Sequence, residues 1–130
     1  MAKKIMVVDD EEDTRTLTID ILHAEGYEVS SAIDGADALK KLKKHGVDLI
    51  LLDIMMPGIK PKEIITKIDK MQSCKKTKIS YFSVVEFTPE QKKDIMKSKK
   101  IVGYIQKPFT NEELVNKIKK MLWCTLVIFI

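Results

Sequence analysis

One stretch of the chain, residues 49–58, constrains the fold more than any other. Its sequence is Leu-Ile-Leu-Leu-Asp-Ile-Met-Met-Pro-Gly. Consecutive apolar residues that end near a Pro-Gly turn are typical of a strand buried on both faces. Such strands lie in parallel sheets covered by helices, and functional groups gather at the carboxyl edge of these sheets. Asp53 stands at that edge, where a desolvated carboxylate needs a cation or hydrogen-bond donors.

Composition limits the classes of protein that fit. A chain of 130 residues with 45% apolar residues has the size and composition of one domain with one core. The formal charge of +4 is modest, and the lysine pairs fall in separate segments with no basic stripe among aromatics. The sequence therefore gives little support to nucleic-acid binding. Cys74 and Cys124 match no metal or disulfide spacing, and no signal peptide is apparent, so we expect reduced thiols and a cytoplasmic location.

Apolar runs and turn residues predict five strand–helix units. The strands are expected at residues 5–8, 28–32, 49–52, 79–85 and 101–105. In the first helix Leu17, Ile21 and Ala24 recur at helical spacing, and residues 72–77 look like a polar connector. Pro61 suits a first helical position, and capping boxes begin at Thr88 and Thr110. Strict alternation with short loops predicts an α/β fold, with a parallel sheet and helices on both sides.

Acidic residues follow the first strand directly. Residues 9–13 are five consecutive carboxylates, which favour a helix N-terminus because acids stabilise the positive end of the helix dipole. Asp9 and Asp10, however, come straight off a buried strand and would meet Asp53 at one edge of the sheet. Oxygen ligands of this kind suit a hard divalent cation such as Mg²⁺. We therefore favour a metal site over capping alone.

The same edge would also carry Ser83, from the fourth strand, and Lys107, after the fifth. His23 and His45 belong to helices and are expected on the surface, so no base stands ready to activate Ser83. The arrangement fits phosphoryl transfer to a carboxylate instead. Asp53 would become an aspartyl phosphate, Mg²⁺ on Asp10 and Asp53 would neutralise part of the charge, and Lys107 and Ser83 would contact the other phosphoryl oxygens.

These residues resemble those of response-regulator receiver domains, the CheY-like family. The resemblance rests on Asp9-Asp10 after strand one, Asp53 followed by Met56-Pro57-Gly58, Ser83 at the end of strand four and Lys107-Pro108-Phe109 after strand five. It covers roughly residues 3–122. The family implies a flavodoxin-like (βα)5 three-layer sandwich whose five-stranded parallel sheet has the strand order 2-1-3-4-5.

The resemblance also implies a mechanism. A histidine kinase or phosphotransfer protein would phosphorylate Asp53, with Mg²⁺ bound by Asp10, Asp53 and the Met55 backbone carbonyl, and by Asp9 through water. Ser83 and Tyr104 would form the switch that alters the face of helix four, strand five and helix five. The domain would be a phosphoacceptor rather than an enzyme acting on other substrates. Its partners would be that kinase and a downstream protein target, with no direct nucleic-acid contact.

Three departures from the family pattern stand out. Val84 follows Ser83 where the family usually has a small residue, so it is expected to narrow the pocket, to slow phosphorylation or to shift the population of the active state. Lys60-Pro61 replaces the usual acid-glycine pair, which predicts an altered turn into the third helix. Met55 and Val85 are apolar where the family often has polar residues that orient a hydrolytic water. We therefore expect a long-lived phosphoryl group.

The last residues, 123–130, form an apolar tail beyond the receiver domain of residues 1–122. The tail is too short to cross a bilayer. It fits an extended last helix, a dimer contact, a peripheral membrane anchor, or the start of a segment in a longer protein. A homodimer would form through this tail or through the face of helix four, strand five and helix five.

Three alternative functions remain open from the sequence. The chain could be the receiver piece of a larger hybrid kinase or regulator, or a receiver-like module that takes no phosphate. A magnesium-dependent phosphatase with Asp53 as nucleophile is less well supported, because such enzymes usually carry a second acid at the position of Met55.

Overall fold

The structure, a computed structural model, describes residues 2–84, 87–95 and 97–123. Strands and helices alternate along the chain, as the sequence predicts. The strands are β1 (Lys4–Val8), β2 (Glu28–Ala32), β3 (Leu49–Leu52), β4 (Lys78–Ser83) and β5 (Ile101–Gln106). The helices are α1 (Glu12–Ala24), α2 (Gly35–Lys44), α3 (Pro61–Asp69), the short 3₁₀ helix η1 (Gln72–Cys74), α4 (Pro89–Ile95) and α5 (Asn111–Trp123).

All strands are parallel and form one sheet in the order β2-β1-β3-β4-β5. The register aligns the ends of the two central strands, since Val8 on β1 pairs with Leu52 on β3. The residues that follow them, Asp9 and Asp53, therefore leave the sheet side by side. This order confirms the flavodoxin-like topology and puts the carboxyl ends of all five strands at one edge.

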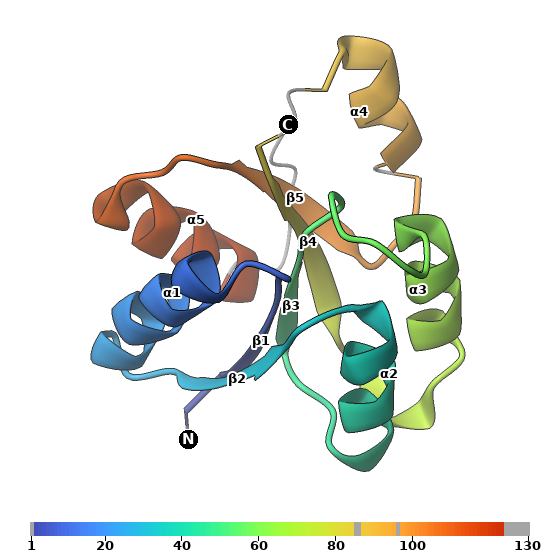
Figure 1. Cartoon of the computed structure of the whole chain (residues 1–130), viewed down its shortest axis with the longest axis horizontal. Helices are drawn as coiled ribbons and strands as arrows, with labels where there is room; N and C mark the ends of the chain where they lie inside the picture. The colour runs from blue at the N-terminus through green and yellow to red at the C-terminus, as the bar shows by residue number, and fades with distance from the viewer. Residues whose placement is uncertain (1, 85–86, 96, 124–130) are drawn as a thin grey trace.

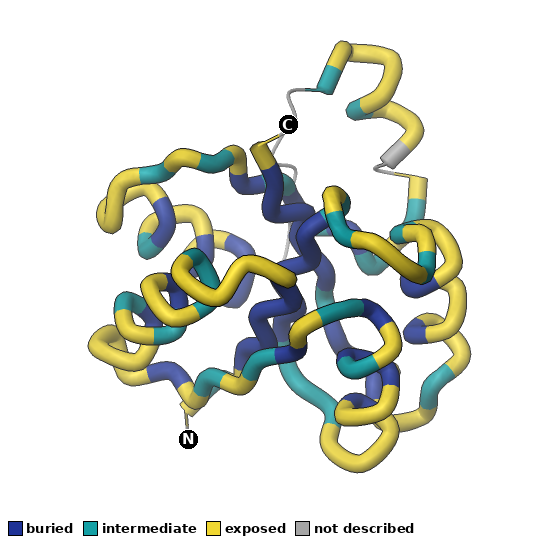
Figure 2. The backbone as a smooth tube through the Cα atoms, viewed as in Figure 1, coloured by how far each residue is buried: buried dark blue, intermediate teal, exposed yellow. Residues whose placement is uncertain are grey.

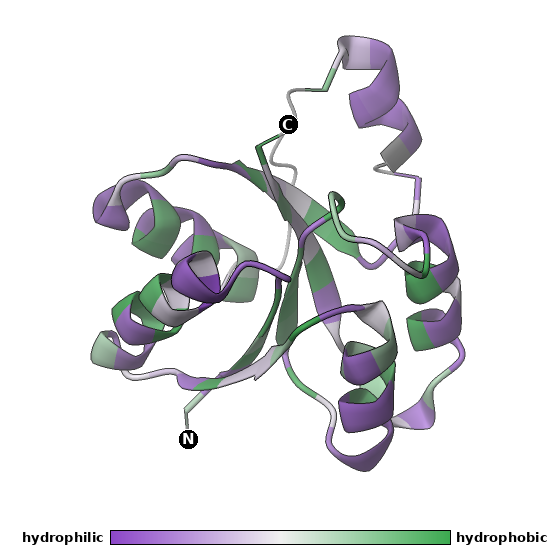
Figure 3. Cartoon of the chain, in the orientation of Figure 1, coloured by the Kyte–Doolittle hydropathy of each residue, from purple (hydrophilic) through white to green (hydrophobic). Residues whose placement is uncertain are grey.

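Two apolar cores hold helices on both faces of the sheet. On one face α1 and α5 cover β1, β3 and β4 through residues such as Leu22, Leu51 and Ile118, and on the other α2 and α3 cover them through Leu42, Ile50 and Ile64. Figure 1 shows this three-layer arrangement, and Figure 2 shows the strands buried between helices whose outer sides are exposed. Figure 3 shows the matching hydropathy, with apolar strands and helices that are polar outside. The sheet and the helices on its two faces form three layers, which confirms the predicted three-layer sandwich.

The helix ends follow local rules that the sequence displays. Thr88 and Gln91 bond reciprocally at the start of α4, with donor–acceptor distances of 2.9 and 3.2 Å. Thr110 and Glu113 do the same at the start of α5, at 3.3 and 3.1 Å. Pro61 occupies the first turn of α3. Helix α4 is the outlying helix in Figure 1, and neither apolar core includes any of its residues 89–94.

The face of α1 differs from the prediction. Thr18 and Leu22 are its buried residues, whereas Leu17 is 54% exposed and Ala24 is also exposed. The Thr18 hydroxyl donates to the Thr14 carbonyl at 2.7 Å, so this polar side chain is buried at little cost. A pattern that counts only apolar residues therefore places the helix face one residue out of position.

The predicted polar connector at residues 72–77 is partly core. It contains η1, with Cys74 and Thr77 buried, and the hydroxyls of Ser73 and Thr77 donate to the Leu42 and Val47 carbonyls at 2.6 Å each. These bonds join the segment to the end of α2 and the start of β3. The segment is polar in sequence and therefore looks like a connector. It can still pack against the core because its hydroxyls donate to backbone carbonyls.

The ends of two elements also differ from the prediction. Strand β4 ends at Ser83 rather than residue 85, and Val85 lies outside the described residues. Helix α5 continues to Trp123, and the rest of the apolar tail, residues 124–130 with Cys124, lies outside them too. No helix in the described ranges is long and apolar enough to cross a membrane.

Candidate functional site

Three carboxylates meet at the carboxyl edge of the sheet. The backbone N–H groups of Asp9 and Asp53 continue the ladder, donating to the Ala32 and Val8 carbonyls at 3.2 and 3.0 Å. Asp10 follows Asp9 and is exposed. Carboxylate oxygens of Asp9, Asp10 and Asp53 lie within 4.8 Å of one another. The register of the two central strands thus produces the acidic cluster that the sequence predicts.

Asp9 is the most enclosed member of the cluster, with no exposed surface. One carboxylate oxygen accepts the Glu11 N–H at 3.0 Å, and the other pairs with the Lys107 ammonium. The Arg15 guanidinium, from the first turns of α1, donates to the Asp9 carbonyl at 2.8 Å. Asp9 is therefore held on three sides. Arg15 had not been singled out in the sequence, although it follows the acidic run on the same helix.

Asp53 is 5% exposed and has fewer partners than Asp9. Its Oδ1 accepts the Met55 N–H at 2.9 Å, and its Oδ2 lies 3.6 Å from the Lys107 Nζ. Burial raises the pKa of the Asp53 carboxyl above its ordinary value, and the nearby Asp9 charge adds to that rise. The Met55 N–H and the Lys107 charge oppose it. A further cation at this carboxylate would favour the ionised form, which is the nucleophilic one.

Lys107 joins the cluster from the loop after β5. Its backbone N–H donates to the Ser83 carbonyl at 2.8 Å, which ties the loop to the end of β4. Its ammonium lies 4.7 Å from the centre of the Phe82 ring, and its side chain is 12% exposed. The Lys107 charge is thus fixed between Asp9 and Asp53. The pairing with Asp9 goes beyond the sequence prediction, in which Lys107 contacts only a phosphoryl oxygen.

Ser83 and Tyr104 occupy different surroundings. Ser83 is fully buried at the end of β4, on the same edge as the acids. Tyr104 is half-buried on β5, its ring centre 5.2 Å from that of Phe87. The Lys92 ammonium lies 5.9 Å from the centre of the Tyr104 ring, so α4 and β5 meet here. Tyr104 lies in this aromatic contact, and Ser83 at the acidic edge.

A cavity of about 520 Å³ opens over the acids. Its rim includes Leu17, Met55, Val84 and Phe109 beside Asp53. Met55 and Val84 are 61% and 62% exposed. Val84 therefore lies at the opening of the cavity, which is the position from which it is expected to narrow the pocket. Leu17, which in the sequence marks only a helical spacing, and Phe109 have no predicted role at the site.

The donor set suits a hard divalent cation. Three carboxylates gather where only one lysine is close, so the cluster of described residues carries excess negative charge. Mg²⁺ takes oxygen ligands from one or two carboxylates and keeps several waters, which the exposed Asp10 and the open cavity allow. The side chains present therefore fit the ion that the sequence predicts.

Comparison with known proteins agrees with this geometry. The model of the response regulator receiver domain family matches residues 5–119. The chain belongs to the response regulator receiver domain family. The receiver is 34% identical to the alkaline phosphatase synthesis transcriptional regulatory protein PhoP of Bacillus subtilis, over 94% of this chain and 49% of that protein. The chain thus spans about half the length of this curated relative.

Solved structures extend the likeness to the fold. Chemotaxis protein CheY4 of Vibrio cholerae is 30% identical with a TM-score of 0.85, covering 94% of this receiver and 100% of that chain. The receiver domain of the hybrid histidine kinase CckA is 26% identical with a TM-score of 0.73, covering 92% and 98%. A chemotaxis response regulator and the receiver domain of a hybrid histidine kinase are therefore both similar to this chain.

Proposed function

We propose that this receiver accepts a phosphoryl group on Asp53 and uses it to change a protein-binding surface. The observation that carries the proposal is the joint position of Asp53, the acidic pair and Lys107 at one open edge. Burial raises the pKa of Asp53, so a cation beside it, such as Lys107 or a bound divalent ion, would favour the ionised carboxylate and would stabilise the charge of a phosphoryl group there.

The reaction follows from the groups present. An Asp53 carboxylate oxygen attacks the phosphorus of a phosphohistidine on a histidine kinase or phosphotransfer protein. The P–N bond breaks, an acyl phosphate forms, and the imidazole nitrogen takes a proton from solvent. Lys107 lies close enough to move from the Asp53 oxygen to a phosphoryl oxygen. The Met55 N–H donates to the Asp53 carboxylate and holds it in one orientation.

The ion that we propose is Mg²⁺, bound by Asp10, Asp53 and the Met55 carbonyl, with Asp9 through water. When bound, it would supply positive charge beside the phosphoryl oxygens. Ser83 would donate to a phosphoryl oxygen and Tyr104 would respond, so that the face of α4, β5 and α5 changes partners. The contact of Phe87 and Lys92 with Tyr104 supports a link between α4 and β5.

We further propose that the chain is a phosphoacceptor domain of residues 1–122 and acts in the cytoplasm. The buried, unpaired thiol of Cys74 is consistent with a reducing compartment. The piece of a hybrid kinase stays an alternative, supported by the likeness to the CckA receiver. The phosphatase alternative has no support from a second acid, because Met55 stands at that position.

Intact-mass measurement tests the proposal. The protein is incubated with Mg²⁺ and a small acyl phosphate donor, and so is the variant Asp53→Asn. We expect a mass gain of one phosphoryl group on the wild type and none on Asp53→Asn. An adduct on both proteins, or on neither while both remain folded, would reject Asp53 as the acceptor. Steady release of product from a generic phosphate ester would instead favour the phosphatase.

A further inference from the structure

Several lysines that are scattered along the sequence gather at the edge of the sheet opposite Asp53. In a strand–helix–strand unit the helix runs antiparallel to the strands, so helix carboxyl ends and strand amino ends share one edge. We call the lysines found there the lysine face, defined by six residues: Lys3, Lys4, Lys44, Lys76, Lys78 and Lys100. The sequence alone gave no basic surface, because these residues lie up to about a hundred positions apart.

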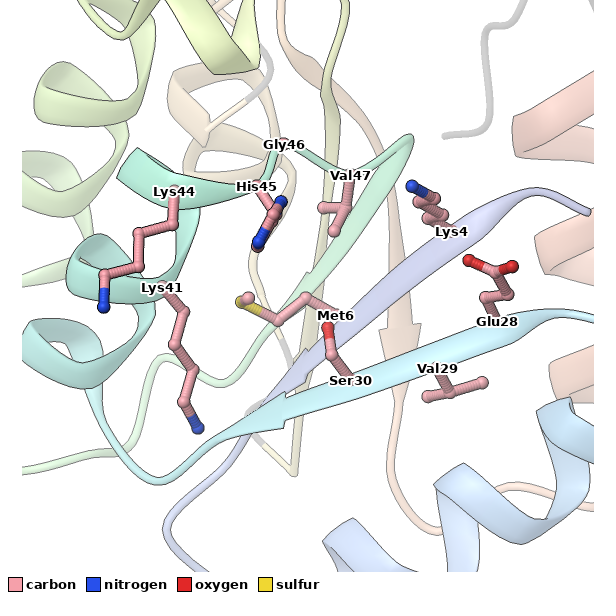
Figure 4. A pocket seen from close by; sticks show the side chains of 10 residues that line it. All are labelled: Lys4, Met6, Glu28, Val29, Ser30, Lys41, Lys44, His45, Gly46 and Val47. Carbon is pink, nitrogen blue, oxygen red and sulfur yellow. The ribbon is translucent and has the colours of Figure 1, made fainter.

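Two hollows join the members of this face. One, of about 350 Å³, is lined by Lys4, Lys44 and Val47, and Figure 4 shows Lys4 on β1 across from Lys44 and His45 at the end of α2. The other, of about 510 Å³, is lined by Lys3, Lys4, Lys76 and Val47. Because they share Lys4 and Val47, the hollows adjoin. The surface is therefore continuous from α2 to the start of β4.

Contacts extend the face to the end of α5. The Lys78 ammonium donates to the Met121 carbonyl at 3.0 Å, and the Lys3 ammonium lies 5.1 Å from the centre of the Trp123 ring. Lys100 donates to the Cys74 carbonyl at 2.6 Å. These partners are neutral and leave the positive charge of each lysine uncompensated. Trp123 itself is 63% exposed.

The face carries less negative than positive charge. The ion pairs among the described residues all use lysines outside it. Four acids also lie at this edge. Glu25 follows α1, Asp69 ends α3, Glu28 is beside Lys4 in the β1–β2 register, and the Asp48 carboxylate accepts the Lys4 backbone N–H at 2.8 Å. The lysines outnumber them. A surface of this charge attracts a polyanionic partner over about a Debye length.

We propose that the lysine face, together with Trp123 and the tail that follows it, binds an anionic lipid bilayer. Beyond Trp123 the sequence is Cys-Thr-Leu-Val-Ile-Phe-Ile, which contains no charged residue. A nucleic acid would gain nothing from these apolar side chains, whereas a bilayer accepts both lysines at its headgroups and apolar residues below them. Trp beside Lys is the usual pair at a membrane–water interface.

The proposed orientation leaves the phosphoacceptor edge facing water. Asp53 follows the carboxyl end of β3, whereas Lys4 and Lys78 begin β1 and β4, so the two surfaces lie at opposite ends of the parallel strands. A bilayer on the lysine face would therefore not cover the cavity over the acids. The two activities are independent, and Asp53→Asn is expected to bind lipid as the wild type does.

Sedimentation of the full chain with vesicles tests the proposal. We expect binding to vesicles of mixed phosphatidylcholine and phosphatidylserine that weakens with added salt, and little binding to phosphatidylcholine alone. Replacing two lysines in Lys4→Gln/Lys76→Gln should lower the partition coefficient about 25-fold, at about fivefold for each lysine near an anionic surface. Lys60→Gln/Lys62→Gln removes the same charge from exposed residues at the start of α3 and should bind normally.

A second variant tests the tail in the same full chain. Ile128→Ser/Phe129→Ser keeps the charge and should reduce binding to the mixed vesicles. Equal binding by both lysine double variants would overturn the proposal, and so would undiminished binding to phosphatidylcholine alone. Displacement of the vesicles by duplex DNA, with binding to DNA that is stronger and depends on the same lysines, would assign the face to nucleic acid instead.

Discussion

Lys107 is the residue on which the acidic cluster depends when no divalent cation is bound. Its ammonium pairs with the fully buried Asp9 and lies 3.6 Å from Asp53. Removing one partner of a buried pair leaves an uncompensated charge, which typically costs about 3–5 kcal/mol. We expect Lys107→Ala to lower the free energy of unfolding by roughly 3 kcal/mol in the presence of a chelator, measured by urea denaturation.

Magnesium should rescue this variant. Without Lys107 the three carboxylates have no competing cation among their described contacts, so Mg²⁺ is expected to raise the stability of Lys107→Ala more than that of the wild type. Lys60→Ala, an exposed lysine at the start of α3, serves as the control and should show the wild-type increment. An equal Mg²⁺ increment in Lys107→Ala and wild type would contradict the competition between lysine and ion.

Met55 is expected to set the lifetime of the phosphoryl group, a prediction that rests on the proposed function. Its side chain is 61% exposed on the rim of the cavity beside Asp53 and offers no hydrogen bond to an attacking water. Met55→Asn should accelerate dephosphorylation about five- to tenfold, the effect of one hydrogen bond worth about 1 kcal/mol in the transition state. Loss of the phosphoryl adduct from isolated protein, followed by intact mass, measures it.

The matched control for Met55 is Leu17→Asn, because Leu17 lines the same cavity from α1. It adds the same amide without standing two residues after Asp53. Equal acceleration by both variants would mean that polarity of the cavity, rather than the position of residue 55, controls hydrolysis. An unchanged lifetime in Met55→Asn would remove Met55 from the explanation.

The position of the acids at this site could be predicted from the sequence, whereas the pairing of Asp9 with Lys107 could not. Asp9 and Asp53 directly follow apolar strands, so the parallel sheet alone brings them together. The contact of Lys107 with Asp9 depends on the conformation of a long side chain and on a loop held by the Ser83 carbonyl. Leu17 was misplaced because Thr18, its buried neighbour, satisfies its hydroxyl within the helix. Neither effect leaves a periodic pattern in the sequence.

Among the helices, α2 has the N-terminus with the clearest dependence on pH. Asp34 caps it by accepting the Asp37 N–H at 2.8 Å, and the Asp37 carboxylate accepts the Ile33 N–H at 3.0 Å. The Ile33 hydrogen bond and the neighbouring Lys41 hold the pKa of Asp37 below its ordinary value of 3.8. Because the pKa of Asp37 is lower in the folded state, its ionised carboxylate stabilises the protein above pH 3.8. This stabilisation is lost as the pH falls through the pKa of the folded state.

The variant Asp37→Asn isolates that contribution. It should be less stable than the wild type at neutral pH by up to about 1 kcal/mol, the usual range for groups at helix N-termini. The difference should shrink as the pH falls below 3.8, where the wild-type carboxyl also becomes neutral. Unfolding free energies at several pH values measure it, and a difference of constant size would show that the charge is not responsible.

Two glycines show which junctions between elements are closely packed. A Cβ added to Gly46, after α2, would lie 1.8 Å from the Ser73 carbonyl oxygen, which is backbone. One added to Gly103, on β5, would lie 2.5 Å from the Met121 Cε, the end of a flexible side chain. We expect Gly46→Ala to cost about 3 kcal/mol or more and Gly103→Ala about 1 kcal/mol, since only the second site can adjust.

Urea denaturation of both glycine variants compares the two junctions directly. The fold shows why Gly46 matters: Ser73 also donates to the Leu42 carbonyl at 2.6 Å, so η1 lies against the end of α2. The sequence does not indicate this junction, because residues 72–77 look like a polar connector. A Gly103→Ala variant less stable than Gly46→Ala would mean that β5 and α5, rather than α2 and η1, form the stricter junction.

At the scale of the whole molecule, a bound cation should raise the stability of the folded state. An ion that binds only the folded chain stabilises it by about 1.4 kcal/mol at ten times its dissociation constant. Asp9 is buried and paired with Lys107, whereas Asp10 is exposed and belongs to no ion pair among the described residues. Asp10 can therefore be changed with little effect on the packed structure.

We expect Asp10→Asn to unfold at or slightly above the wild-type temperature in a chelator, because the change relieves repulsion among three carboxylates within 4.8 Å of one another. Rising Mg²⁺ should then increase the unfolding temperature of the wild type but hardly that of Asp10→Asn, so that the order of stability reverses. Thermal unfolding followed by circular dichroism over a Mg²⁺ titration measures both curves. Parallel curves would show that Asp10 does not bind the ion, because removing a ligand from a binding site must weaken the stabilisation that the ion provides.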